Sequence, residues 1–300
     1  LVHECRTDAV AIAEDVSGSP GLAAGTKEHG YGFDFRFAMG VADFWIKLVK
    51  ETRDENWPLE RLWHELTNHR AEEATISYAE CHDQALVGDQ TLMMRLMGSR
   101  IYTDMHKDHA GIETFRAVAL HKMIRLITLA TANAGYLNFM GNEFGHPEWV
   151  DFPSDRNHFS FRYARRQWSL KYDPDLMYAG LSAFDRQMIR LAKAADVFES
   201  ADPVLCHLHE DNKIMAFARN ALFFVFNFHP FHSYFDYRVA APPGKYRLVL
   251  DTDESRFGGH DRLAPDQVFF TVSDDTEGPG CHRLSLYLPS RTALVLEKCS

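Results

Sequence analysis

Apolar and polar residues follow two different patterns along this chain, and the first pattern fills residues 1 to about 200. Short apolar runs at residues 10–13, 74–79 and 135–140 predict buried parallel strands. Apolar residues at helical spacing over residues 44–50, 59–66, 120–129 and 181–191 predict helices between and after these runs. Repeated strand-then-helix units predict a parallel sheet with helices outside it, either open or closed into a barrel.

The second pattern begins near residue 200 and consists of short, closely spaced strands. Residues 213–219 and 222–228 read as a hairpin, and further strands are predicted at 246–251, 268–272, 284–288 and 292–297. Strands divided in this way by Pro, Gly and Asp are typical of a β-sandwich. Because Ala201-Asp202-Pro203 breaks the last helix, we expect an α/β region over residues 1–200 and an all-β sandwich domain over residues 201–300.

Composition and charge narrow the range of partners. The chain has 300 residues, a formal net charge of −10 and 46% hydrophobic residues, which is typical of a globular protein. An acidic surface repels phosphate backbones, so we expect no nucleic-acid partner. No apolar run approaches the length of about 18 residues that a membrane span needs, so we expect no membrane partner either.

The cysteines and the first residues bear on the compartment. Five cysteines with no close pair argue against a disulfide framework or a metal knuckle and favour a reducing compartment. The first residues are too charged for a secretory signal, and the absence of an initiator Met suggests a chain cut from a longer one.

Polar side chains follow all three predicted parallel strands, at the point where each strand ends. They are Glu14 and Asp15, then Glu80, His82 and Asp83, and finally Asn142 and Glu143. In α/β barrels the reactive residues stand at the C-terminal ends of strands. Glycoside hydrolysis and transfer need converging carboxylates, because one acid protonates the leaving oxygen while another carboxylate attacks or activates water.

Each of these residues also has a structural interpretation. Asp15 and Ser17 are suited to cap a following helix. His82, taken alone, is typical of a buried histidine with satisfied nitrogens, and Glu143 of a side chain that braces its own loop. Glu14, taken alone, is more typical of a structural acid. Polar groups on three strand ends together favour a site, although they do not specify one reaction.

Five strings of residues resemble one known family. They are AEDVSG at 13–18, YAECHDQALVGD at 78–89, FMGNEFGHPEW at 139–149, YARRQW at 163–168 and FNFHP at 226–230. They resemble the eukaryotic 1,4-α-glucan branching enzymes of the α-amylase superfamily, with Cys81 where Ser is usual. The resemblance covers essentially the whole chain. It implies the C-terminal part of a (β/α)8 TIM barrel followed by an all-β sandwich.

The resemblance also implies roles for particular residues. Glu14 would be the general acid/base, Asp83 would stabilise the transition state, and His82 would bind the same sugar. Asn142 and Glu143 would lie in the substrate-binding site. The implied reaction cleaves α-1,4 bonds of glycogen, amylose or amylopectin and transfers the segment to a 6-hydroxyl, with no metal or organic cofactor. The implied location is cytoplasmic, with a plastid left open.

One required residue does not match. The family's retaining mechanism needs an aspartate nucleophile about 5 Å from the acid, on the preceding strand and in an Arg-x-Asp arrangement. Thirteen residues precede Glu14, too few for that strand and its helix. Asp34 precedes Arg36 in the reverse order and follows Glu14, so we expect a core or loop role for it. We therefore expect negligible turnover by this chain alone, an N-terminal remainder as its partner, and an open sheet edge that favours aggregation.

Two further functions stay open at this point. The first is an α-glucan hydrolase of the amylase type, which product analysis would separate from a branching enzyme. The second is a non-catalytic glucan-binding remnant, in which exposed aromatic residues such as Trp149 or Trp168 stack on sugar rings, although buried packing is the expected use of each.

Overall fold

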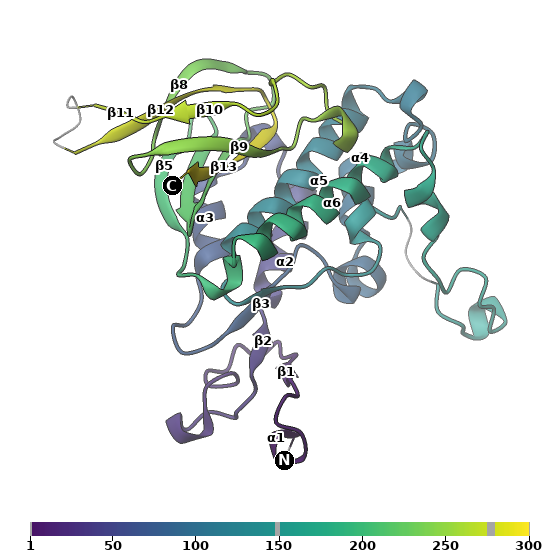
Figure 1. The fold of residues 1–300 in the computed structure, drawn as a ribbon. Helices are drawn as coiled ribbons and strands as arrows, with labels where there is room; N and C mark the ends of the chain where they lie inside the picture. Colours follow the sequence, from purple (N-terminus) through teal and green to yellow (C-terminus); the bar gives the residue numbers. More distant parts are fainter. Residues whose placement is uncertain (1, 148–150, 275–279, 300) are drawn as a thin grey trace.

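The computed structural model describes residues 2–147, 151–274 and 280–299, so Trp149 lies outside the described residues. Its first part contains a parallel sheet whose strands pair in chain order (Figure 1). They are β1 (Ile12–Ala13), β2 (Phe35–Phe37), β3 (Thr75–Ser77) and β4 (Gly135–Tyr136). All three pairings are parallel, so the C-terminal ends of the strands lie along one edge of this sheet.

α-Helices connect these strands, except between β1 and β2, where a short 3-10 helix (Thr26–Glu28) lies. After the short N-terminal α1 (Val2–Cys5), α2 (Met39–Glu51) and α3 (Leu59–Thr67) join β2 to β3. Next, α4 (Leu92–Met97) and α5 (Ile112–Thr131) join β3 to β4, and α6 (Met177–Ala194) follows β4. The four predicted helices are confirmed in α2, α3, α5 and α6. Within the described residues, no helix has the length and apolar character needed to cross a lipid bilayer.

The sequence did not predict β2, because this strand is three residues long and carries a charged residue at its centre. Arg36 is buried in the strand, and its Nη1 donates to the Glu73 carboxylate at 3.1 Å. The ion pair satisfies the guanidinium inside the sheet, and a pattern of apolar residues cannot reveal such a pairing.

The second part is a sandwich of two antiparallel sheets. In the described part of the chain, six strands pair in the order β10-β9-β13-β7-β6-β5 and three in the order β11-β12-β8. Their bounds are β5 (Val204–His209), β6 (Ile214–Arg219), β7 (Leu222–Asn227), β8 (Tyr234–Ala240), β9 (Lys245–Asp251), β10 (Val268–Phe270), β11 (Val272–Ser273), β12 (His282–Leu288) and β13 (Thr292–Cys299). The sequence missed β5 and β8, which are edge strands with mostly exposed or half-buried residues and therefore no clear apolar alternation.

The six-stranded sheet is buried on both faces. Phe224 and Phe226 of β7 belong to the core that the sheet shares with the helices, together with Trp45 of α2. Phe223 and Val225, which alternate with them, belong to the core between the two sheets. This explains why β7 reads as a continuous apolar run. The first core contains residues on both sides of residue 200, and the division into domains at 1–200 and 201–300 stays a prediction.

Polar side chains of the sandwich also satisfy the ends of two helices. The Glu210 carboxylate accepts the backbone N–H of Leu59 at 2.9 Å, at the N-terminus of α3. The Arg219 guanidinium donates to the carbonyl oxygens of Ala130 and Ala132 at 3.0 and 2.6 Å, at the C-terminus of α5. Both contacts have the charge sign that the helix dipole favours, so the sandwich stabilises the helices it covers.

Candidate active site

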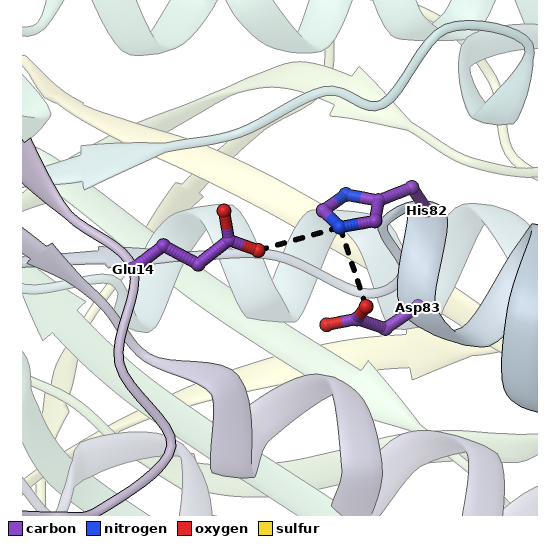
Figure 2. A group of neighbouring side chains, drawn as sticks. All are labelled: Glu14, His82 and Asp83. Carbon is purple, nitrogen blue, oxygen red and sulfur yellow. Dashed lines mark ion pairs between the residues drawn. The ribbon is translucent and has the colours of Figure 1, made fainter.

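Three of the predicted site residues lie together at the edge where the parallel strands end (Figure 2). Glu14 directly follows β1, whereas His82 and Asp83 follow β3. The Nε2 atom of His82 lies 3.3 Å from Glu14 Oε1 and 3.2 Å from Asp83 Oδ1. The three ligand atoms all lie within 4.8 Å of one another. We call these three residues the strand-end cluster; the structure brings them together, and their chemical roles stay predictions.

The strand-end cluster is open to solvent. The side chains of Glu14, His82 and Asp83 are 49%, 48% and 40% exposed. The interpretation of His82 as a buried histidine is therefore wrong. All three groups can reach a ligand from the solvent side. They also offer one ligand atom each to a cation, but two exposed carboxylates and one imidazole do not make a closed donor set, and we assign no metal.

The turn after β3 is fixed by hydrogen bonds from its own residues. The Cys81 N–H donates to Gln84 Oε1 at 3.0 Å, and the Asp83 N–H donates to the Cys81 sulfur at 3.4 Å. Gln84 in turn donates to Asp43 of α2 at 2.8 Å. These contacts set the backbone that carries His82 and Asp83. Burial raises the pKa of the Cys81 thiol, so this thiol packs as a neutral group.

Glu80 joins three neighbouring segments below this turn. Its carboxylate is buried and accepts the backbone N–H of Leu92 at 2.5 Å, at the start of α4. Burial raises the pKa of Glu80, while hydrogen bonds from Leu92 and Asn142 and the charge of Arg166 oppose that shift. Glu80 therefore holds the end of β3 against α4 and against the loop that follows β4. The sequence placed Glu80 at a strand end, but nothing in the pattern distinguished this buried carboxylate from the exposed ones.

Asn142 and Glu143 occupy that loop after β4. Asn142 is buried. The Glu143 carboxylate accepts the N–H of Gly141 at 2.7 Å and lies 4.0 Å from Lys171 Nζ. This is the bracing contact that the structural interpretation of Glu143 expected. Across the described residues, no hydrogen bond or ion pair joins Asn142 or Glu143 to the strand-end cluster, so their substrate-binding role stays a prediction.

A buried guanidinium fixes the end of β4 against two helices. Arg125 of α5 donates to Asn138 Oδ1 at 2.9 Å and to the Asp185 carboxylate of α6. Asn138 also donates to Asp185, at 3.0 Å. The side chain of Arg125 is fully buried and that of Asp185 is 11% exposed. This triad positions the strand end that leads into the Asn142 loop, and the sequence analysis missed it because its members lie on three separate segments.

Two other aspartates have structural roles. The Asp34 carboxylate accepts the N–H of Ala11 at 2.7 Å and lies 3.0 Å from His3 Nε2, and the bond from Ala11 lowers its pKa. A core or loop role was expected for Asp34. Asp15 accepts both the hydroxyl and the N–H of Ser17, at 2.5 and 3.2 Å. The two residues form a turn, so the interpretation that they cap a following helix is wrong.

Trp168 is neither fully buried nor free. Its ring is 41% exposed, lies 5.7 Å from the ring of Phe144 between centroids, and has Lys171 Nζ 4.8 Å from its own centroid. Trp168 is therefore exposed, with one contact to Phe144, and the expectation of buried packing for it is wrong.

Comparison with known proteins adds the family. Residues 206–298 match the family described as alpha amylase, C-terminal all-beta domain. The curated 1,4-alpha-glucan-branching enzyme of Equus caballus is 48% identical over 300 residues, which is 99% of this chain and 43% of the horse protein. The proteins of the same name from Saccharomyces cerevisiae and Solanum tuberosum are 47% and 44% identical over 99% of this chain, which covers 42% and 35% of their lengths. The chain thus spans less than half the length of these relatives.

Solved structures agree on the fold. The α-amylase from H. orenii matches with a TM-score of 0.54 at 14% identity, over 99% of this chain and 55% of that chain. A debranching enzyme from Nostoc punctiforme matches with a TM-score of 0.55 at 14% identity, over 99% of this chain and 53% of that chain. At this identity the match shows the fold alone, the C-terminal part of a (β/α)8 barrel followed by an all-β sandwich. Sequence and fold together place the chain in the eukaryotic 1,4-alpha-glucan-branching enzyme family of the α-amylase superfamily, as the counterpart of its C-terminal portion.

Proposed function

We propose that the strand-end cluster belongs to the active site of a glucan branching enzyme. The enzyme cleaves an α-1,4 bond of glycogen, amylose or amylopectin and transfers the released segment to a glucan 6-hydroxyl. The observation that carries the proposal is the meeting of Glu14, His82 and Asp83 from two different parallel strands. Relatives 44–48% identical over nearly the whole chain carry the name of this activity.

Each side chain of the cluster has a chemical task in this reaction. Glu14 protonates the departing glycosidic oxygen and later removes the proton of the acceptor hydroxyl. Asp83 and His82 hydrogen-bond hydroxyls of the sugar at which the bond breaks, and the negative charge of Asp83 stabilises the positive charge that develops there. Both steps need side chains that a polymer can reach, which agrees with their half-exposed positions.

The nucleophile is proposed to come from the remainder of a longer protein. A retaining mechanism places two carboxyl groups about 5 Å apart. Asp83 lies within 4.8 Å of Glu14, but the family resemblance gives it the sugar-binding role. We therefore propose the N-terminal remainder as an obligatory partner of this chain. We also propose a cytoplasmic location, with a plastid as the alternative, since its five cysteines are all free thiols.

The test uses the full-length protein that contains this chain, incubated with amylose and followed by analysis of branch linkages. Glu14→Gln is expected to lower the branching rate by at least a thousandfold while the far-UV circular dichroism is unchanged. Glu28→Gln is the matched control, because Glu28 is an exposed acid of the same loop, and its rate should stay within twofold of the unchanged protein.

Three results would count against the proposal. Near-normal branching by Glu14→Gln would refute the acid/base role. Reducing ends that accumulate without new branches would favour the hydrolase. Branching by the 300-residue chain alone would show that Asp83, or another residue of this chain, is the nucleophile.

A further inference from the structure

A cavity lies between α5 and the sandwich, and none of the residues that line it belongs to the strand-end cluster. Its volume is about 270 Å³. Phe115, Arg116 and Lys122 of α5 line one side, and the loop after β9 and Arg291, just before β13, line the other. We propose that this cavity binds a small oxyanion, namely a phosphate group that is either free or carried by a sugar.

The charge of the cavity wall carries the first step of the argument. Arg116 Nε donates to one oxygen of Asp54 at 2.8 Å, and Arg291 Nε donates to the other at 2.7 Å. The Asp54 side chain is 1% exposed. Two guanidinium groups thus share one buried carboxylate, which leaves one positive charge uncompensated. Because the whole chain has a net charge of −10, this local excess arises from the arrangement of these three residues and not from the overall field.

Unused donors carry the second step. Arg116 Nη1 donates weakly to the carbonyl of Leu96 at 3.4 Å, and Arg291 Nη1 donates to the carbonyl of Pro230 at 3.1 Å. Over residues 2–147, 151–274 and 280–299, the Nη2 atom of neither arginine makes a hydrogen bond. Both side chains line the cavity and are 23% and 14% exposed. Fixed guanidinium donors with spare N–H groups suit an oxyanion better than any neutral ligand.

The other cations of the wall, Arg262 and Lys122, already have hydrogen-bond partners. Asp253 accepts Nε and Nη2 of Arg262 at 2.8 and 3.0 Å. Lys122 Nζ donates to two backbone carbonyls of the loop after β9, at 2.5 and 2.9 Å. Burial lowers the pKa of Lys122 to about 8, and the carboxylates of Asp253 and Asp251 oppose that shift. The anion is therefore expected at Arg116 and Arg291.

The shape of the cavity decides which phosphate it can take. One water molecule needs roughly 10–15 Å³ of such volume, so a cavity of about 270 Å³ has room for more than a bare phosphate ion. The rings of Phe115 and His260 pack with centroids 4.5 Å apart and form an aromatic part of the wall. A sugar ring can pack on such a surface, so a hexose monophosphate fits the volume and the chemistry.

The test measures binding by the full-length protein that carries this chain, by isothermal titration calorimetry and by the thermal unfolding midpoint. Inorganic phosphate and glucose 6-phosphate are the two probes. We expect saturable binding that raises the midpoint, because a ligand that binds the folded state stabilises it.

Arg116→Lys and Arg291→Lys keep a positive charge beside Asp54 but remove the spare Nη2 donor, so each should weaken binding at least tenfold. Arg53→Lys is the matched control, since Arg53 precedes Asp54 with an 85% exposed side chain, and binding should be unchanged.

The outcomes separate the sources of the phosphate group. Equal affinity for both probes identifies a site for free phosphate. Tighter binding of glucose 6-phosphate that His260→Ala abolishes identifies a sugar phosphate. The proposal is overturned if neither probe binds saturably, or if both lysine variants, folded by circular dichroism, bind as tightly as the unchanged protein. These results do not depend on branching activity, so they can fail or succeed separately from the proposed function.

Discussion

The parallel sheet and the six-stranded sheet of the sandwich differ in how they are held together. The strands of the parallel sheet are two or three residues long, whereas β13 has eight residues and β7 has six. All six residues of β7 are buried. The short strands have few ladder hydrogen bonds, so their positions depend on side chains such as Arg125 and Glu80. The comparison shows that regular strand pairing is concentrated in the sandwich, while the candidate chemistry lies where regular pairing stops.

The surroundings of β1 and of β7 also differ in exposure. In the first region Val10, Ile12 and Val16 around β1 are 61%, 42% and 83% exposed, and the strand-end cluster lies next to them. In β7, by contrast, no residue is exposed. A site that binds a polymer must be accessible to solvent. An accessible site at a sheet edge has fewer packing contacts, so the sheet edge is less stable there. The shared core is therefore expected to stabilise both regions.

The strongest test of this shared core is Phe224→Ala. Phe224 is buried in the core that the sandwich shares with the helices, and its ring stacks on Phe217 at 5.1 Å. Truncation should cost about 4 kcal/mol of unfolding free energy, through lost burial and a residual cavity. Urea unfolding followed by tryptophan fluorescence, which reports mainly on the helices around Trp45, and by far-UV circular dichroism should give one transition at lower urea.

Phe235→Ala is the control, because Phe235 is 77% exposed on β8 and its loss should cost less than about 0.5 kcal/mol. If Phe224→Ala instead unfolded the sandwich in a separate transition and left the tryptophan signal unchanged, the two regions would not share a core.

The second prediction concerns the polar ties of the parallel sheet. Arg125→Met removes the partner of Asp185, whose side chain is 11% exposed. Leaving a buried carboxylate unpaired should destabilise the protein by about 3 kcal/mol, the low end for a broken buried pair, because Asn138 still donates to Asp185. The expected midpoint shift is measured by urea unfolding.

A double variant separates charge from packing in that result. Arg125→Met combined with Asp185→Leu removes both charges and should recover most of the loss. If the single and the double variant were equally unstable, the shape of Arg125 and not its charge would hold the end of β4.

The same comparison explains what the sequence could reveal. Apolar spacing predicted α2, α3, α5, α6 and the long sandwich strands. Elements buried on one or both faces have apolar residues at regular positions or in continuous runs, and the sequence shows these directly. It missed β2 and the edge strands β5 and β8, where an ion pair or solvent replaces apolar packing. β2 carries a charged residue at its centre, so no continuous apolar run marks it, as one marks β1, β3 and β4.

For the site, the sequence named residues but not their neighbours. The strand-end rule and the family resemblance selected Glu14, His82 and Asp83, which the structure brings together. The sequence could not distinguish Glu80, which is buried and joins three segments, from the exposed carboxylates of Glu14 and Asp83. Contacts such as Arg116 with Asp54 join residues 62 positions apart, and only the tertiary structure brings them together.

The third prediction is that two buried groups, His121 among the helices and Asp251 in the sandwich, respond to acid in opposite directions. His121 of α5 is fully buried, and burial together with the charges of Arg125 and Lys122 holds its pKa well below 6.5. Below pH 6.5 the unfolded chain binds a proton that the folded chain does not, so stability is present above this pH and falls as the pH is lowered, by about 1.4 kcal/mol per pH unit. In the sandwich, burial raises the pKa of Asp251 to about 7, so the folded chain takes up a proton first and gains stability as the pH falls below 7.

Substitutions separate these opposing contributions when the unfolding free energy is measured between pH 7 and pH 5. Relative to the unchanged protein, His121→Leu should gain about 2 kcal/mol over this range, because the acid-sensitive group of the helical region is gone. Asp251→Asn should lose stability over the same range, because the proton that favours the folded sandwich can no longer bind. His64→Gln, at an exposed position of α3, is the control and should follow the unchanged protein. Parallel curves for His121→Leu and the unchanged protein would mean that His121 is protonated without cost, and the opposition between His121 and Asp251 would then be refuted.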